Sequence, residues 1–366
     1  MSPRIYRSQP IGSLLRPLYL RDARRALRSG EISVADYKRV EDRAVDDALA
    51  LQEAAGLDII NDGEQRRMSF LGSLLDAVEG LTRSSAVTHP WHEDGEHVVH
   101  LTLGLAVTGK LRRRRSMGGE EFVYARARAR RPLKMTVPSP MMLAMFWSPR
   151  ESTAAYRDPF EMFADGASLI REEIVELARL GCEYVQIDAP ELANLVDPDA
   201  QRTLLEERGI SPKRILGEGV EILNSLAGAQ GVTFGLHICR GNNDGRWLAK
   251  GGYDAISREV FRRAERFDEF LLEYDDARSG SFEPLGDVPR DKRVVLGLVS
   301  TKRNQLESAD DLVRRVEDAA RFFPRDQLAI STQCGFASGI KGNPVEPAMQ
   351  DRKLQLVARV ARRLWG

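Results

Sequence analysis

Four side chains that can bind a metal follow apolar runs in this sequence. His237 and Cys239 lie two residues apart at the end of one such run, so on a strand both would point to the same face. Glu273 ends a second run, and Cys334 closely follows a third. One imidazole, two thiolates and a carboxylate are enough to hold Zn²⁺. If these groups converge, the metal could take a substrate thiol as a further ligand, and the chain would be an enzyme.

The elements that must position these residues alternate regularly along the chain. Short apolar runs predict strands near residues 6–11, 59–60, 135–137, 184–187, 233–236, 270–272, 294–298 and 328–330. Between them, apolar residues at three- and four-residue steps predict helices, for example over 170–180, 253–266 and 310–323. Strand and helix in alternation predict right-handed crossovers and a parallel sheet. Eight strands favour a closed (β/α)₈ barrel, the TIM barrel, in one domain over 1–366, with an open doubly wound sheet as the alternative.

Residues 89–131 interrupt this alternation. They favour strands and turns, and Met117-Gly118-Gly119 is typical of a hairpin turn before a strand at Phe122-Val123-Tyr124. We therefore expect an inserted antiparallel hairpin over one end of the barrel. The insertion contains four of the five histidines (His89, His92, His97 and His100), but no cysteine accompanies them, and surface histidines are the more ordinary interpretation.

Composition excludes several classes of function. Lysine plus arginine equals aspartate plus glutamate, 54 against 54, so no overall field attracts nucleic acid or a membrane. The basic stretches 112–115 and 126–131 are interpreted as a solvated hairpin face. No run approaches the ~18 apolar residues of a membrane span, and the N-terminus is not of signal-peptide type. Three cysteines in a long chain indicate a reducing cytoplasm.

Several motifs together resemble the catalytic barrel of cobalamin-independent methionine synthase and its single-barrel relatives. The match covers most of the chain. It comprises Ile11-Gly12-Ser13, Asp62-Gly63-Glu64, Phe146-Trp147-Ser148, Gln186-Ile187-Asp188-Ala189-Pro190, His237-Ile238-Cys239, Glu273-Tyr274-Asp275-Asp276-Ala277-Arg278-Ser279 and Cys334-Gly335-Phe336. The resemblance implies zinc bound by His237, Cys239, Glu273 and Cys334. Their positions at the ends of predicted strands indicate the same four residues. The resemblance also implies methyl transfer to homocysteine, giving methionine.

Zinc would make the chemistry possible, because a free thiol with a pKa near ~8.5 is mostly protonated at neutral pH, whereas a metal-bound one is a thiolate. We expect Glu273 to be the most easily displaced ligand and to loosen when the substrate sulfur arrives. The thiolate would then attack an electrophilic carbon in line and form a thioether. Glu273 and Asp188 are the residues to which we assign catalytic roles.

The resemblance also implies residues that hold the amino-acid part of the thiol. Ile11 and Ser13 would bind the carboxylate, and Glu64 with Asp188 would bind the ammonium. Trp147 resembles the tryptophan against which the family stacks the pterin of methyltetrahydrofolate. Without the family, helix caps would be the more ordinary interpretation of Ser13, Glu64 and Asp188. For Trp147 the alternative is a core or rim aromatic.

Two departures from the family concern the methyl donor. The full-length enzyme has two barrels and this chain has one. The family's seventh strand ends in a histidine that serves proton transfer at the folate leaving group, whereas this chain has Val299 near that place. A smaller change is Ala189, where the family usually has glutamate.

The donor therefore stays open among methyltetrahydrofolate, a methylcorrinoid such as methylcobalamin, free or on a corrinoid protein, and another methyl or alkyl donor. An epoxide-opening transferase of the coenzyme M type, a carbon–sulfur lyase and a non-catalytic zinc or thiol sensor are the alternatives. Basic residues near the predicted rim could serve an anionic substrate: Arg240, Arg246, Arg278, Lys302 and Arg303. Arg278 could equally pair with Asp275 or Asp276.

Overall fold

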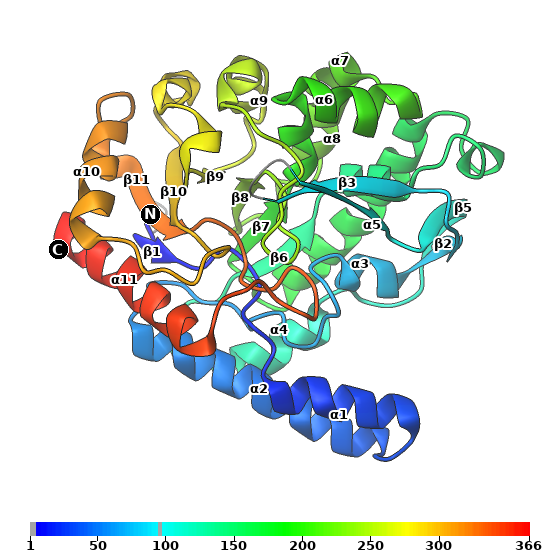
Figure 1. Ribbon diagram of the computed structural model, residues 1–366, viewed down its shortest axis with the longest axis horizontal. Helices are drawn as coiled ribbons and strands as arrows, with labels where there is room; N and C mark the ends of the chain where they lie inside the picture. The colour runs from blue at the N-terminus through cyan, green and yellow to red at the C-terminus, as the bar shows by residue number, and fades with distance from the viewer. Residues whose placement is uncertain (1–4, 94–96) are drawn as a thin grey trace.

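A curved sheet of seven parallel strands forms the centre of the molecule (Figure 1). The computed structural model describes residues 5–93 and 97–366. The strand order is β1-β11-β10-β9-β8-β7-β6, and each neighbouring pair is parallel. The strands are β1 Ser8–Gln9, β6 Met135–Pro138, β7 Tyr184–Asp188, β8 Thr233–Ile238, β9 Glu269–Glu273, β10 Arg293–Val299 and β11 Leu328–Thr332. The alternation of apolar runs and helical segments predicted this parallel sheet.

The two edge strands of the sheet are tied to one short segment. Asp58 N donates to Ser8 O of β1 (3.1 Å), and Ile60 N donates to Pro132 O just before β6 (3.0 Å). Ile60 forms a single parallel bridge with Leu133. The expected second strand at 59–60 is therefore reduced to one bridge, and the sheet curls until both of its edges reach the same piece of chain.

Helices lie outside the sheet and cover it. They are α1 Leu18–Ser29, α2 Val34–Ala55, α3 Gly72–Ala77, α4 Gly119–Arg126, α5 Pro159–Arg179, α6 Pro198–Ala200, α7 Pro212–Arg214, α8 Val220–Asn224, α9 Ser257–Arg263, α10 Ala309–Ala319 and α11 Pro347–Trp365. The helices expected over 170–180 and 310–323 correspond to α5 and α10. The helix expected over 253–266 is shorter, because a 3₁₀ turn at Tyr253–Ala255 precedes α9. The strands are buried on both faces, which explains their continuous apolar runs.

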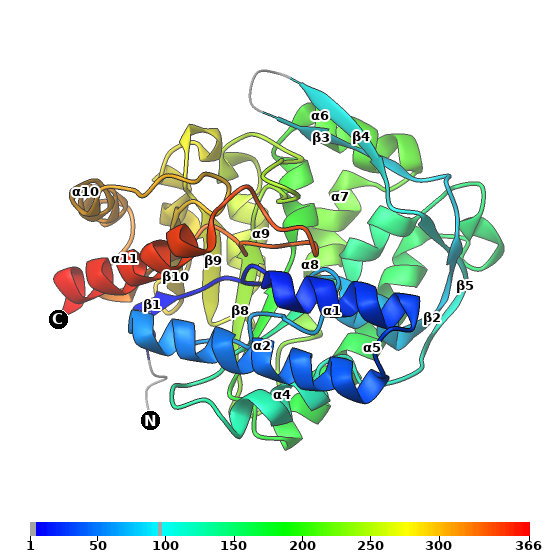
Figure 2. The same cartoon turned by 60° about the horizontal axis from the view of Figure 1, so that its bottom comes forward.

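The insertion contains two small antiparallel sheets, both separate from the parallel sheet. Strand β2 (Val78–Arg83) pairs with β5 (Leu105–Arg113), and β3 (Thr88–His92) pairs with β4 (Val98–Thr102). Figure 2 shows β3 and β4 projecting past the helices at one end of the molecule, on the side away from the antiparallel pair α1 and α2. An antiparallel insertion is confirmed, but it begins earlier than expected and ends at Arg113.

The second half of the expected hairpin is wrong, because residues 119–126 form helix α4. The buried residues of α4 are Gly119, Phe122 and Ala125, at three-residue steps that a helix satisfies and an alternating strand does not. The buried Glu173 carboxylate accepts hydrogen bonds from Met117 N and Gly118 N (both 2.8 Å) and so holds the start of the helix. Tertiary anchoring by Glu173 overrides the strand preference of Phe122-Val123-Tyr124.

Over residues 5–93 and 97–366, no helix is both long and apolar enough to cross a membrane.

Candidate metal centre and substrate pocket

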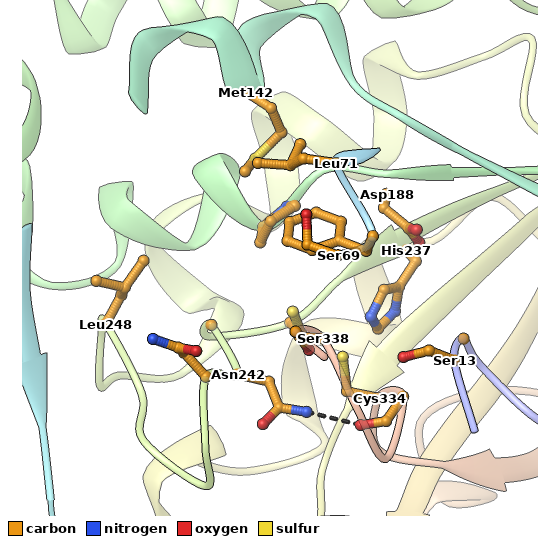
Figure 3. A pocket seen from close by; sticks show the side chains of 18 of the residues that line it. Ser13, Ser69, Leu71, Met142, Asp188, His237, Asn242, Leu248, Cys334 and Ser338 are labelled. Carbon is orange, nitrogen blue, oxygen red and sulfur yellow. Dashed lines mark hydrogen bonds between the residues drawn. The ribbon is translucent and has the colours of Figure 1, made fainter. Parts of the chain in front are cut away.

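Three of the four predicted ligands meet at the carboxyl ends of the strands. His237 lies on β8, Cys239 directly follows that strand, and Cys334 follows β11. Their ligand atoms all lie within 4.8 Å of one another, and Figure 3 shows His237 beside Cys334. Across the described residues this is the one such cluster of histidine, cysteine and acidic side chains. The four histidines of the insertion form no such cluster within the described residues.

The donor set fits Zn²⁺. Nδ1 of His237 contacts Leu271 O (3.0 Å), which fixes the ring and the tautomer with a proton on Nδ1. Nε2 is buried and has no hydrogen-bond partner within the described part of the chain. A free imidazole nitrogen beside two thiols is the chemistry of a zinc site.

The two cysteines are coupled, and one of them favours the thiolate form. The contact with Cys239 lowers the pKa of Cys334, and the same contact raises the pKa of Cys239. Burial lowers the pKa of His237, but the Cys334 sulfur, Asp188 and the carbonyl of Leu271 together raise it. The three groups are therefore electrostatically coupled, and a metal cation that binds them competes with protons for the same atoms.

Glu273, the fourth predicted ligand, lies nearby at the end of β9 but is not part of this cluster. Its Oε1 accepts from Lys302 Nζ (2.9 Å), and its Oε2 accepts from Arg240 N (2.7 Å) and Gln333 Nε2 (3.0 Å). Burial raises the pKa of Glu273, but Lys302, Arg240 and Arg278 together lower it to about 2. The carboxylate is ionised and held by protein donors, so its role as a ligand stays a prediction.

The pocket in front of the cluster contains the predicted amino-acid contacts. Ile11, Ser13, Glu64 and Asp188 line it, in a cavity of about 160 Å³. A Cβ on Gly335 would meet Ser13 Oγ at 2.6 Å, so only glycine lets the segment after Cys334 approach Ser13 this closely.

The two carboxylates that line this pocket, those of Asp188 and Glu64, lie in different surroundings. Burial raises the pKa of Asp188 to about 7. Glu64 accepts from Thr136 Oγ1 (2.8 Å) through Oε1, whereas its Oε2 is buried without a partner among the residues described. Glu64 also has a positive φ of 52°, and backbone strain of this kind is characteristic of functional sites. Both groups can accept hydrogen bonds from a ligand ammonium.

Sequence reasoning missed the hydrogen-bond network beneath the pocket. The buried Lys134 donates to Gln9 Oε1 (2.8 Å) and Gln186 Oε1 (2.7 Å). Gln186 Nε2 then donates to Ile11 O (2.7 Å) and Asp188 Oδ1 (2.6 Å). One amide thus links the Ile-Gly-Ser segment to Asp188. A lysine in front of the buried strand Met135–Pro138 was the available signal.

Trp147 does not line this pocket. Its side chain is 3% exposed, and its Nε1 donates to Arg208 O (3.0 Å). The aromatic residues that do line the pocket are Phe70 and Trp91, the latter from the inserted strand β3. Sequence reasoning missed both, because neither lies at the end of a strand of the parallel sheet.

The chain matches the family model "Cobalamin-independent synthase, Catalytic domain" over residues 8–351. It belongs to that family. It is 33% identical to the uncharacterized protein YxjH of Bacillus subtilis, over 98% of this chain and 95% of the relative. It is 24% identical to a methionine synthase of Saccharolobus solfataricus, over 89% and 86% respectively. A crystal structure of a putative vitamin-B12 independent methionine synthase from Listeria monocytogenes is similar at a TM-score of 0.72, with 25% identity, covering 100% of this chain and 99% of that one. The resemblance read from the motifs is confirmed.

The arginines and the lysine near the rim form ion pairs or hydrogen bonds with other residues of the protein. Arg278 pairs with Asp276 (2.6 Å), Arg246 with Glu93 (2.6 Å) and Lys302 with Glu273, while Arg240 donates to Gly251 O (2.8 Å). The lining of the pocket, as far as the structure describes the chain, contains no arginine or lysine. The geometry therefore offers no side-chain cation to an anionic substrate in the cavity.

Proposed function

We propose that this protein is a zinc-dependent methyltransferase that methylates the sulfur of homocysteine to give methionine. The observation that supports it most directly is one cavity lined by His237, Cys239 and Cys334 together with Asp188 and Glu64. The first three can hold the metal. The carboxylates can hold the ammonium of an amino acid whose thiol reaches the metal.

We also infer that residues 58–60 complete an eight-position (β/α)₈ barrel in a single domain over 1–366. The hydrogen bonds that join this segment to both edge strands support this. In such a barrel the carboxyl ends of all strands share one rim, as the proposed site requires.

In this proposal, separate residues of this chain hold the metal, bind the substrate and position the binding groups. His237, Cys239 and Cys334 would hold zinc, which when bound supplies the acidity that makes the substrate thiol a thiolate at neutral pH. Asp188 and Glu64 bind the ammonium, and Ile11 and Ser13 lie where the carboxylate would be placed. Lys134 and Gln186 keep Asp188 and the backbone of Ile11 in position. These contacts align the sulfur for attack.

We keep Glu273 as a fourth, exchangeable ligand in this proposal. Its carboxylate would leave at least one of its donors, Lys302, Arg240 N or Gln333, to reach the metal. The variant Glu273→Gln keeps the shape of the side chain and removes its charge, so a lower zinc affinity in this variant would support direct ligation.

The alternatives fit the pocket less well. A coenzyme M-type thiol carries a sulfonate, and the described lining offers it no lysine or arginine. A structural or sensor zinc site is typically closed by its own ligands, whereas this cluster opens into a cavity.

Metal content and zinc-edge absorption spectra test the proposal, recorded with and without homocysteine. We expect stoichiometric zinc, an additional sulfur ligand when homocysteine is added, and methionine formation with a suitable donor. An unchanged zinc shell would refute the role of homocysteine, and absence of stoichiometric zinc after supplementation would refute the proposal as a whole.

A further inference from the structure

The pocket in front of the metal cluster has a second, apolar half. Phe70, Leu71, Trp91, Met142, Met145 and Leu248 line it. Figure 3 shows Met142 and Leu71 across the pocket from Cys334 and Ser13. None of these six side chains is needed to hold a thiol amino acid. They form the wall that a methyl donor would face.

The charges that line the cavity favour a cation there. Asp188 and Glu64 are its carboxyl groups, and Cys239 and Cys334 are its thiols. No lysine or arginine joins them anywhere in the lining that the structure describes. The cations that balance these carboxylates lie behind the lining, because Arg67 is 3.9 Å from Glu64 Oε1 and Lys134 is linked to Asp188 through Gln186. On the pocket side a cationic donor would therefore meet the carboxylates with no competing cation in the described lining.

The side chains of the apolar half suit a cation that cannot form hydrogen bonds. Phe70 and Trp91 belong to this lining, and aromatic rings attract methylated onium groups through their π electrons. Met142 and Met145 add polarizable thioethers. A folate pterin carries many polar groups, whereas the six side chains of this wall offer one hydrogen-bonding group, the indole N–H of Trp91. The rest of the lining includes the neutral polar residues Ser69, Asn242, Asn243 and Ser338.

The end of β10 gives a separate argument about the leaving group. Val299 is buried, and the two hydroxyls that follow are occupied, since Ser300 Oγ donates to Asp275 (2.6 Å) and Thr301 Oγ1 donates to Gln333 (2.9 Å). No titratable side chain belongs to the apolar half of the lining as described. A leaving group that departs as an anion needs a proton donor, whereas one that departs as a neutral molecule does not.

We propose that the apolar half of this pocket binds a small methyl sulfonium ion as the methyl donor, with Trp91 as its main contact. This inference rests on the proposed function, because the acceptor is the homocysteine thiolate. The thiol proton goes to solvent before transfer. A sulfur lone pair of the thiolate forms the new bond to the methyl carbon, and the pair of the breaking carbon–sulfur bond stays on the donor sulfur. A neutral thioether leaves, no proton is required, and no electron carrier takes part.

Binding is tested first, on the zinc-loaded protein with trimethylsulfonium as the probe and tert-butanol as a neutral molecule of similar size. Saturation-transfer NMR on the methyl protons should show binding of the cation and much weaker binding of the alcohol. Trp91→Leu should weaken sulfonium binding roughly five- to thirty-fold, as expected for the loss of one cation–π contact. Trp91→Phe should retain most of the binding, and Trp365→Leu on the C-terminal helix should change nothing. Equal binding of the two probes, or no difference between the Leu and Phe variants at position 91, would overturn the proposal.

Transfer is tested next with deuterated trimethylsulfonium and homocysteine. We expect trideuteromethyl methionine by mass spectrometry and an equal amount of dimethyl sulfide in the headspace. Methionine formed from methyltetrahydrofolate or methylcobalamin but not from the sulfonium would refute this donor and leave the proposed function standing. A zinc shell that does not change with homocysteine would instead refute the proposed function.

Discussion

Replacing Lys134 with methionine should change how the stability of the protein depends on pH. Lys134 is fully buried, and burial lowers its pKa from 10.5 to about 7, although Asp188, Glu269 and Glu64 act in the opposite direction. Between pH 7 and 10.5 the unfolded chain therefore binds a proton at this lysine that the folded chain does not. Stability should rise with pH across this window.

The magnitude follows from the two pKa values. Raising the pH from 7 to 9 should add about 2 kcal/mol to the free energy of unfolding through Lys134 alone. Lys134→Met lacks this contribution but loses the hydrogen bonds to Gln9 and Gln186 at every pH. The prediction is therefore tested by the change in unfolding free energy between the two pH values. The difference between the two proteins at a single pH also contains the lost hydrogen bonds and does not test it.

Urea unfolding of metal-free protein, followed by circular dichroism at pH 7 and pH 9, measures this quantity. The gain in unfolding free energy from pH 7 to 9 should be larger for the natural protein than for Lys134→Met by about 2 kcal/mol, with similar m-values. Equal gains in the two proteins would show that the buried lysine does not titrate in this range. The same variant should bind homocysteine more weakly while keeping its zinc, since Gln186 would lose the donor that orients its amide.

Three further predictions address the site and the fold. Cys334→Ser should lose stoichiometric zinc, measured by metal analysis after dialysis, whereas Cys182→Ser, which alters a cysteine outside the cluster, should keep it. Glu64→Gln should raise the KM for homocysteine about tenfold or more because a charge-assisted hydrogen bond is lost, with zinc content unchanged; an unchanged KM would remove Glu64 from the ammonium site. Glu173→Gln should lower the unfolding free energy by roughly 3 kcal/mol, because the buried carboxylate pairs with Arg113 (2.8 Å) and holds the start of α4; thermal unfolding that matches the natural protein would contradict this.

The parallel sheet and the metal cluster could be predicted because they depend on local patterns. Strands buried on both faces leave continuous apolar runs, and the chain reverses after each run at the same rim. His237, Cys239 and Cys334 follow such runs and do converge. A two-residue strand such as β1, or a single bridge such as that of Ile60, leaves almost no pattern, so the boundaries there could not be set from the sequence.

Other features depended on contacts between distant parts of the chain. Helix α4 forms where aromatic and β-branched residues favour a strand, because Glu173 from another helix holds its first residues. Trp147 is turned into the core by its bond to Arg208 O. The pairing of Glu273 with Lys302 joins residues 29 positions apart. None of these partners can be read from the segments in which the residues occur.

The separation of β3 and β4 from the parallel sheet has a consequence for evolution and engineering. The proposed metal ligands lie at strand ends of the parallel sheet, whereas Trp91 reaches the pocket from a two-stranded sheet that pairs with no strand of the parallel sheet. The hairpin is instead joined to the loop after Cys239, where His92 N donates to Trp247 O (2.8 Å) and Glu93 pairs with Arg246 (2.6 Å). Substitutions elsewhere in the hairpin therefore leave the hydrogen-bond ladder beneath the metal untouched. A library that randomises the hairpin but keeps His92 and Glu93 would vary the wall that faces the proposed donor, while the sheet that carries the metal ligands keeps its register.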